Sequence, residues 1–214
     1  MPRETDTLPD IQVQWTESGI PSEESIIDAA AAGMVSRKDE PYESFVKDLS
    51  LSRAKEFLTK MIEYGHESVL EHITFQFWVS MSRVASHQQV RHRMASYTQM
   101  SLRKKRSLTT DDFVVPPQIK SEDLGEWIAD SKQVIDTYEK WLAKGYEVDV
   151  ARRKLTQEAR TDMVMTINAR SLRNYFNLRA KHDADFEINA VAKRMYQLIC
   201  EEGLGFLFED IGFE

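Results

Sequence analysis

The amino-acid sequence predicts an α+β fold: one domain over residues 1–214, built on a β-sheet with flanking helices and a helix-rich C-terminal half. Three observations support this prediction. A strictly alternating segment at 72–81 lies in the first half of the chain, and long helical patterns fill the second half. No repeat, low-complexity tract or Gly/Ser linker divides the 214 residues, a length that suits one domain with a substantial core.

The first half begins with a predicted short strand at 11–16. The run Pro21-Ser22-Glu23-Glu24 then opens a predicted helix that continues through the alanines at 29–32. Between 50 and 64 the apolar residues recur at i, i+3, i+4, i+7 and i+8, which predicts an amphipathic helix that Gly65 ends. From 72 to 81 apolar and polar residues alternate, as in a strand with one face on a core.

Ser82 is the predicted N-cap of the next helix, which runs to about Arg93. The polar segment 96–107 follows, and a short strand is expected near 113–115, closed by two prolines. The remaining sequence predicts helices at about 121–144, 148–165, 169–180 and 184–202. Strands are therefore expected mainly in the first half and helices in the second.

Composition excludes several classes of protein. One cysteine allows neither an intrachain disulfide framework nor a multi-cysteine metal cluster. The N-terminus lacks an apolar signal region and no run of 18 apolar residues occurs, so we expect a cytoplasmic protein that does not bind membranes. The glycines form neither a G-x-G-x-x-G fingerprint nor a Walker loop. The net charge of −7 speaks against a general nucleic-acid binder.

Four of the five histidines lie between residues 66 and 92, which raises the question of a metal site. Glu67 and Glu71 stand beside two of them and are possible ligands for zinc or iron. No H-E-x-x-H motif occurs, however, and His66 and His72 are expected to flank a turn. We therefore predict no metal, and favour histidines that are held by partners or face a nucleotide.

The segment 91–106 holds six Lys/Arg and no acid within an acidic protein. Such a run is often only a solvated surface, but here hydroxyl and amide side chains lie between arginines whose planar guanidinium groups suit phosphate. Gln88, Arg91 and His92 are spaced i, i+3, i+4 and are expected on one helix face. The segment therefore predicts a site for an anionic substrate.

A second polar cluster lies at 168–179. Arg170 and Asn174 are i, i+4 neighbours, while Leu172, Phe176 and Leu178 are expected to pack inward. Asparagine is a poor residue for a helix interior, so three of them in this short segment either bind a ligand or serve as caps and buried polar contacts. The residues alone leave both alternatives open.

These motifs together resemble the flavin-dependent thymidylate synthases. Arg91-His92-Arg93 followed after seven residues by Ser101 is similar to the family's R-H-R-x7-S signature. Further blocks resemble the family's in the same order, over roughly residues 25–190: Gly65-His66-Glu67-Ser68-Val69-Leu70-Glu71-His72, Ser82-Arg83-Val84-Ala85-Ser86-His87-Gln88, Asp149-Val150-Ala151-Arg152 and Asn168-Ala169-Arg170-Ser171-Leu172.

The resemblance implies an enzyme that makes dTMP from dUMP. Methylenetetrahydrofolate would donate the one-carbon unit, and NADPH would supply reducing equivalents through FAD. It also implies a homotetramer whose active sites are assembled from several subunits. One alternative keeps the fold but makes a C5-hydroxymethylated pyrimidine nucleotide. Another, of a different class, is a nucleic-acid-binding module that uses the basic segment 91–106, with an affinity that falls steeply with salt.

The resemblance also implies roles for individual residues. Arg179 matches the arginine that bears on the uracil ring and is the expected catalytic residue. The residues implied in cofactor binding are Ser68, Arg91, His92, Arg93, Gln99, Asn168, Ala169, Arg170 and Asn174, with Ser36 as a further flavin-contacting serine. The residues implied in dUMP binding are Gln88, Arg91, Gln99, Met100, Ser101, Leu102, Arg103, Arg152 and Arg179.

The chain departs from the family pattern in three places. Thr98-Gln99 stands where many members have Asn-Glu, Leu155-Thr156 stands where Leu-Pro is common, and Asp183 occupies a position where a flavin-contacting histidine is expected. The only thiol, Cys200, follows Leu198 and Ile199 and is expected in the core, so it offers no nucleophile for the thiolate mechanism of the other thymidylate synthases. A flavin would then carry the difficult chemistry.

Overall fold

The sheet is the central feature of the fold. A computed structural model describes residues 11–36, 39–104 and 107–212 of the chain. The strands are β1 (Gln12–Trp15), β2 (Thr74–Ser82), β3 (Ala95–Gln99) and β4 (Arg160–Asn168). They form one sheet in the order β1-β2-β4-β3, and every neighbouring pair is antiparallel. An antiparallel sheet combined with many helices confirms the predicted α+β class.

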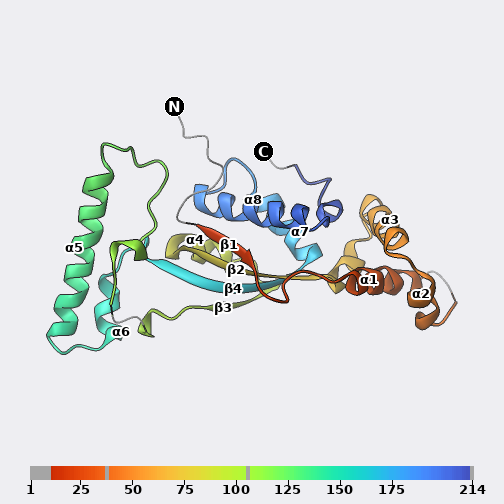
Figure 1. Cartoon of the computed structure of the whole chain (residues 1–214), viewed down its shortest axis with the longest axis horizontal. Coiled ribbons are helices and arrows are strands. Elements are labelled where there is room, and N and C mark those ends of the chain that lie inside the picture. Colours follow the sequence, from red (N-terminus) through yellow and green to blue (C-terminus); the bar gives the residue numbers. More distant parts are fainter. Residues whose placement is uncertain (1–10, 37–38, 105–106, 213–214) are drawn as a thin grey trace.

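The helices are arranged unevenly around this sheet. The α-helices are α1 (Glu23–Val35), α2 (Tyr42–Asp48), α3 (Leu51–Glu63), α4 (Arg83–Gln89), α5 (Leu124–Ala143), α6 (Val148–Ala151), α7 (Ala169–Arg179) and α8 (Phe186–Glu201). The 3-10 helices are η1 (Glu67–His72), η2 (Leu102–Lys104), η3 (Thr110–Asp112), η4 (Arg152–Lys154) and η5 (Gly205–Leu207). Figure 1 shows α7 and α8 over one face of the sheet, α1 to α3 beyond one end, and α5 and α6 at the other. None of the helices in the described ranges is long and apolar enough to cross a bilayer.

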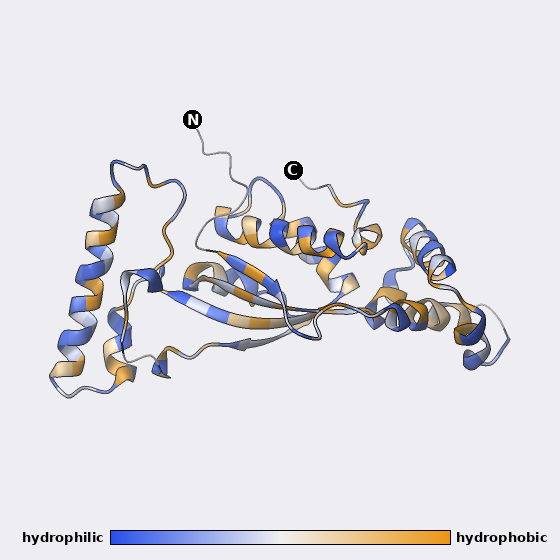
Figure 2. Ribbon diagram, in the orientation of Figure 1, coloured by the Kyte–Doolittle hydropathy of each residue, from blue (hydrophilic) through white to orange (hydrophobic). Residues whose placement is uncertain are grey.

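The main core lies between the sheet and α7 and α8. Alternate residues of β2 and β4 point into it, so that Phe75, Phe77, Met163 and Met165 are at most 1% exposed. Their neighbours on both strands are half-exposed on the opposite face. Figure 2 shows that β4 is hydrophilic where it begins and hydrophobic in its middle. The helix-covered face of the sheet is therefore the apolar face.

Most elements with a clear period or cap are confirmed. These are β1, α1 with its N-cap Ser22, α3, β2, α5, α7 and α8. Gly65 ends α3 as predicted: its φ is 71°, and the His66 N–H donates to the carbonyl of Met61 at 2.8 Å. Only glycine adopts this left-handed conformation without strain.

The helix predicted at 148–165 is wrong. Only Val148–Ala151 is α-helical, and the segment then passes through η4 into the strand β4. Beyond residue 160 the side chains alternate between buried and half-exposed, and β4 pairs with β2 on one side and β3 on the other. Two flanking strands outweigh the good helix propensity of its methionines. The second half of the chain therefore contains a central strand of the sheet.

Four smaller expectations are also corrected. The polar segment 96–107 contains most of β3, whose backbone pairs with β4. The predicted strand near 113–115 is a single bridge between Phe113 and Ala159. The helix predicted to reach Arg93 ends at Gln89, and α2 was not predicted. Cys200 is exposed near the end of α8 rather than buried in the core.

The start of α4 is fixed by a buried carboxylate. Ser82 caps the helix as predicted, since its Oγ accepts from the N–H of Ala85 at 3.2 Å. Glu187 of α8 in turn accepts from the Ser82 N–H at 2.6 Å and from its Oγ at 2.5 Å. Burial raises the pKa of the Glu187 carboxyl, against the two hydrogen bonds that lower it. This contact ties α4, and the residues that follow it, to α8.

Candidate active site

A cavity of about 1030 Å³ opens on the helix-covered side of the molecule. Its walls come from η1, from α4 and the turn after it, from the end of β4, and from α7. Seven predicted site residues line it: Gln88, Arg91, His92, Arg93, Arg170, Asn174 and Arg179. The volume is at the upper end of the range for small-molecule sites in proteins. Two sequence segments about 80 residues apart therefore meet as predicted.

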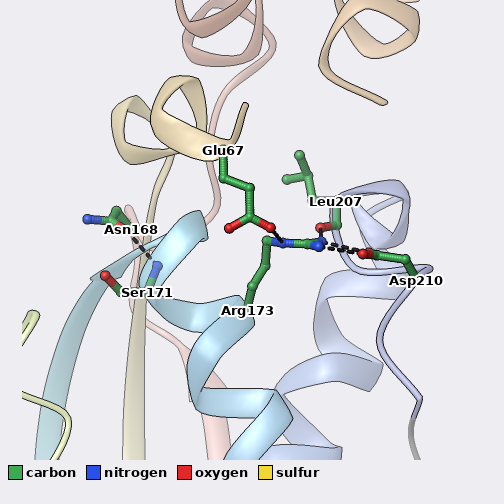
Figure 3. Close-up of polar contacts among 6 residues, drawn as sticks. All are labelled: Glu67, Asn168, Ser171, Arg173, Leu207 and Asp210. Carbon is green, nitrogen blue, oxygen red and sulfur yellow. Dashed lines mark hydrogen bonds and ion pairs between the residues drawn. The ribbon is translucent and has the colours of Figure 1, made fainter. Parts of the chain in front are cut away.

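The helix α7 presents one polar face to this cavity. Asn168 is its N-cap, and the Asn168 Oδ1 accepts from the Ser171 N–H at 2.8 Å (Figure 3). Leu172 and Phe176 are fully buried, which turns Arg170 and Asn174 outward. The capping alternative is thus the one observed for Asn168. Leu178 was expected to pack inward but is 54% exposed at the cavity.

The residues after α4 reach the cavity in a different way from the one predicted. The helix ends at Gln89, so Arg91 and His92 lie in a turn rather than on a helix face. The N–H groups of Arg91 and His92 donate to the carbonyls of Gln88 and Gln89 at 3.3 and 3.2 Å. This tight turn brings Gln88, Arg91 and His92 to the same cavity, although the i, i+4 argument for it was wrong.

Arg179 joins the two walls of the cavity. Its Nε donates to the His92 Nε2 at 3.0 Å, and its Nη1 donates to the Gln88 Oε1 at 3.2 Å. In this arrangement His92 is neutral, with its proton on Nδ1, because Nε2 is an acceptor. Neither partner carries a charge, so the guanidinium retains its full positive charge for an anionic ligand.

Hydrogen bonds from two tyrosines hold Gln89 and the backbone of His92 in place beside the cavity. The Tyr175 hydroxyl donates to the Gln89 Oε1 at 2.8 Å, and the Tyr97 hydroxyl lies 2.9 Å from the carbonyl oxygens of both Gln89 and His92. The Tyr175 ring meets the His92 imidazole edge to face at 4.7 Å. Burial raises the pKa of Tyr97 to about 12 and raises that of Tyr175 as well, so both phenols stay protonated donors.

Burial and the nearby Arg179 lower the pKa of His92 from 6.5 to about 4. Between these two pH values the unfolded chain binds a proton that the folded chain does not, so stability falls as the pH falls through this window. We expect a loss on the order of 1–2 kcal/mol, after allowance for the partial exposure of the ring. Denaturant unfolding at pH 7 and pH 4.5 should show it in the wild type and less of it in His92→Gln, which keeps an acceptor for Arg179. An equal pH dependence in both proteins would contradict this assignment.

Two acidic residues of η1 pair with arginines of α7. The Arg170 Nη1 lies 2.5 Å from the Glu71 Oε1, and both side chains are about half-exposed. The Arg173 Nε lies 2.9 Å from the Glu67 Oε1, and the Arg173 side chain is only 7% exposed. Figure 3 shows the Arg173 side chain between Glu67 on one side and Leu207 and Asp210, near the C-terminus, on the other. All four residues line the cavity, so the pairs fix η1 against α7 along one wall.

Several predicted residues lie elsewhere. Ser68 is exposed on η1 between the two acids, Ala169 is buried at the start of α7, and the Ser36 Oγ donates to the Gly33 carbonyl at 3.0 Å. The predicted dUMP residues that do not line the cavity are Gln99, Met100, Ser101, Leu102, Arg103 and Arg152. Lys105 and Arg106 of the basic segment lie outside the described residues.

Two of the predicted dUMP residues outside the cavity, Arg103 and Arg152, both pair with Asp149. The Arg103 Nε and Nη2 donate to its two carboxylate oxygens at 2.6 Å each, and the Arg152 Nη2 lies 3.1 Å from one of them. The hydrogen bond from Arg103 keeps the pKa of Asp149 below its usual value. The sequence therefore identified two clusters of cationic residues, and in this chain they occupy separate places.

The model of the family described as thymidylate synthase complementing protein matches residues 18–202. The chain belongs to this family. The resemblance that the sequence motifs indicated is thereby confirmed.

Relatives named flavin-dependent thymidylate synthase show the same similarity. The protein of Pyrococcus abyssi is 40% identical over 177 residues, which cover 79% of this chain and 72% of the relative. That of Pyrococcus horikoshii is 41% identical over 150 residues, 67% of this chain and 62% of the relative. That of Saccharolobus solfataricus is 38% identical over 191 residues, 86% and 70% of the two chains. The matched parts thus span about two thirds of these relatives' lengths.

The departures from the flavin-dependent thymidylate synthase pattern have visible consequences. The Gln99 Nε2 donates to the Ser86 Oγ at 3.0 Å and to the Thr161 Oγ1 at 3.1 Å, so this side chain is engaged within the fold. His182 and Asp183 lie in the turn between α7 and α8, outside the set of residues that line the cavity.

Sequence reasoning assigned no ligand to Arg173 or Gln157 and left the role of Asn177 open between ligand binding and a structural contact; all three line the cavity. The spacing of Arg170, Asn174 and Asn177 on α7 was a usable signal, because residues three or four apart share a helix face. Gln157 lies in the turn before β4 and carries no such signal. In the described ranges, no three His, Cys, Asp or Glu side chains gather as a metal site would require.

Proposed function

We propose that this chain is a flavin-dependent thymidylate synthase, which converts dUMP to dTMP with FAD as cofactor, NADPH as reductant and methylenetetrahydrofolate as one-carbon donor. The observation that carries the proposal is Arg179. It is a cation at the wall of a large cavity, and it is oriented by two neutral side chains, Gln88 and His92. A fixed positive charge of this kind can stabilise negative charge that develops on a pyrimidine ring.

On the nucleotide side, Gln88 and Arg91 supply an amide and a guanidinium within the same cavity. Arginine is suited to phosphate because its planar group donates two parallel hydrogen bonds. His92 holds the Nε of Arg179 and thereby sets the direction in which the free edge of that guanidinium points. The role of Arg179 is thus to hold the uracil ring and favour its ionisation.

The lining of the cavity fits FAD as well as a nucleotide. Arg91 and Arg93 provide positive charge for a pyrophosphate. Arg170, although paired with Glu71, adds further N–H donors, and Asn174 adds an amide on the same helix face. When bound, FAD supplies the reducing equivalents that turn the transferred methylene into a methyl group. The chain's own residues bind and orient, and the exposed Cys200 lies on α8, which contributes no residue to the cavity.

We further propose a homotetramer in which several subunits complete each site. Gln88, Arg91 and Arg179 line the cavity, whereas the loop from Gln99 to Arg103 and Arg152 lie elsewhere in the same chain. If all of them bind dUMP, we expect a neighbouring subunit to supply the second group. Three apolar residues exposed at the cavity support burial of this region in an assembly: Val84, Met94 and Leu178. A cytoplasmic location and the absence of a nucleic-acid partner stay predictions.

The test is release of tritium from [5-³H]dUMP by the purified protein with FAD, NADPH and methylenetetrahydrofolate. We expect release that depends on all three additions, and mass spectrometry should show dTMP. A product heavier by one oxygen would instead indicate hydroxymethylation. No release, together with salt-sensitive binding of nucleic acid, would contradict the proposal and favour a nucleic-acid-binding module.

A further inference from the structure

Arg173 differs from the other arginines at the cavity. Its guanidinium donates to the Glu67 Oε1 at 2.9 Å, to the Leu207 carbonyl at 2.5 Å, and to the two oxygens of Asp210 at 2.8 and 2.6 Å (Figure 3). These contacts engage four of the five N–H donors of the side chain. Because two carboxylates face this one cation, it contributes no net positive charge to the cavity. Its role is to hold other groups in place.

The contacts of Arg173 join three segments that are distant in sequence: η1, α7 and the C-terminal segment, defined here as residues 203–211. Glu67 opens η1, on which Ser68 follows directly. Arg173 lies one turn of α7 from Arg170 and next to Asn174. The C-terminal segment therefore reaches the wall that carries two of the predicted flavin-binding residues, Arg170 and Asn174.

Asp210 is held rigidly enough to act as an anchor. Phe208, two residues before it, is fully buried, and its ring lies 5.2 Å from that of Phe176 and 5.9 Å from that of Phe75. Ile211, directly after it, is 5% exposed. The flanking residues thus fix the backbone of Asp210 against the sheet and α7, and its paired hydrogen bonds fix the plane of the Arg173 guanidinium.

The C-terminal segment also lies beyond the family match, which ends at residue 202. Neither the motif blocks nor the comparisons assign a role to any residue in it. We propose that Asp210 is a positioning residue of the flavin subsite, acting through Arg173 to set the distance between η1 and the polar face of α7. The inference rests on the proposed function, since it takes FAD as the ligand of this wall.

The test compares Asp210→Ala with the wild type and with Glu209→Ala, an exposed acid in the same segment. We expect the Kd for FAD to rise about 10-fold in Asp210→Ala, because without the paired hydrogen bonds to Arg173 part of the binding energy is used to restore the spacing of η1 and α7. The Kd for dUMP should change by less than about 2-fold, because Gln88 and His92 hold Arg179 independently. Asp210→Glu, which keeps the carboxylate, should recover part of the affinity.

Hydrogen–deuterium exchange of the full chain separates this inference from the proposed function. Without FAD, the amides of residues 67–72 should exchange faster in Asp210→Ala than in the wild type and Glu209→Ala. If the wild type bound no FAD, the proposed function would fail, and exchange at 67–72 would still decide whether Asp210 positions this wall. Unchanged exchange there would overturn the inference, as would equal losses of FAD affinity in Asp210→Ala and Glu209→Ala.

Discussion

Arg179→Ala is expected to lower kcat for dTMP formation by about 100- to 1000-fold, the usual effect of removing a preorganised group that stabilises charge in the transition state. FAD should remain bound, because the arginines proposed to hold it are Arg91, Arg93 and Arg170. Steady-state rates of tritium release, measured beside the visible absorption of bound flavin, would show the loss of turnover without loss of cofactor.

Two further variants sharpen this test. Arg179→Lys keeps the charge but loses the Nε–H that meets His92, so we expect only partial recovery of kcat. Arg194→Ala removes a half-buried arginine of α8 that pairs with Glu201 and does not line the cavity, and its turnover should match that of the wild type. Wild-type kcat in Arg179→Ala would show that the catalytic role assigned to this residue is wrong.

Arg91→Ala is expected to weaken the binding of both FAD and dUMP, by about 10- to 100-fold each, because a lost hydrogen bond to a charged group costs about 1.5–3 kcal/mol. Arg91 lies in the turn between Gln88 and Arg93 and is exposed to the cavity. Calorimetric titration with each ligand measures the two affinities separately.

Arg93→Ala is the matched control, since Arg93 lies two residues on in the same turn and is assigned to the flavin alone. Its affinity for FAD should fall while its affinity for dUMP is retained. If Arg91→Ala weakened one ligand only, the two ligands would not share this arginine, and the assignment of Arg91 to both would be overturned.

The fold was predictable where short-range rules decide the structure. Gly65 adopts the left-handed backbone conformation that ends α3. The hydroxyl groups of Ser22 and Ser82 accept from free N–H groups at the starts of α1 and α4. The segment 148–165 failed because its structure depends on partners. Val164 pairs with Trp78 on one side and with Thr98 on the other, so β4 is a central strand of the sheet. The local sequence pattern does not predict these two pairings.

Part of the cavity lining was predictable from the sequence, but the way in which it is assembled was not. Gln88, Arg91 and His92 do meet, yet through a turn that ends α4 early, not through a shared helix face. The sequence blocks also placed Ser101 and Arg103 at the nucleotide, whereas this chain keeps them apart from the cavity. Spacing along a chain carries no information about which subunit supplies a residue. The sequence pattern likewise did not predict the contact between Asp210 and Arg173, which are 37 residues apart.

We propose that this acidic chain with one cysteine binds a flavin and a pyrimidine nucleotide together in a cavity lined with arginines. The visible absorption spectrum of the purified protein, recorded with and without dUMP, tests it most directly. We expect a yellow protein, or one that becomes yellow when loaded with FAD, whose flavin bands shift when dUMP is added. A colourless protein that cannot be loaded with FAD would contradict it.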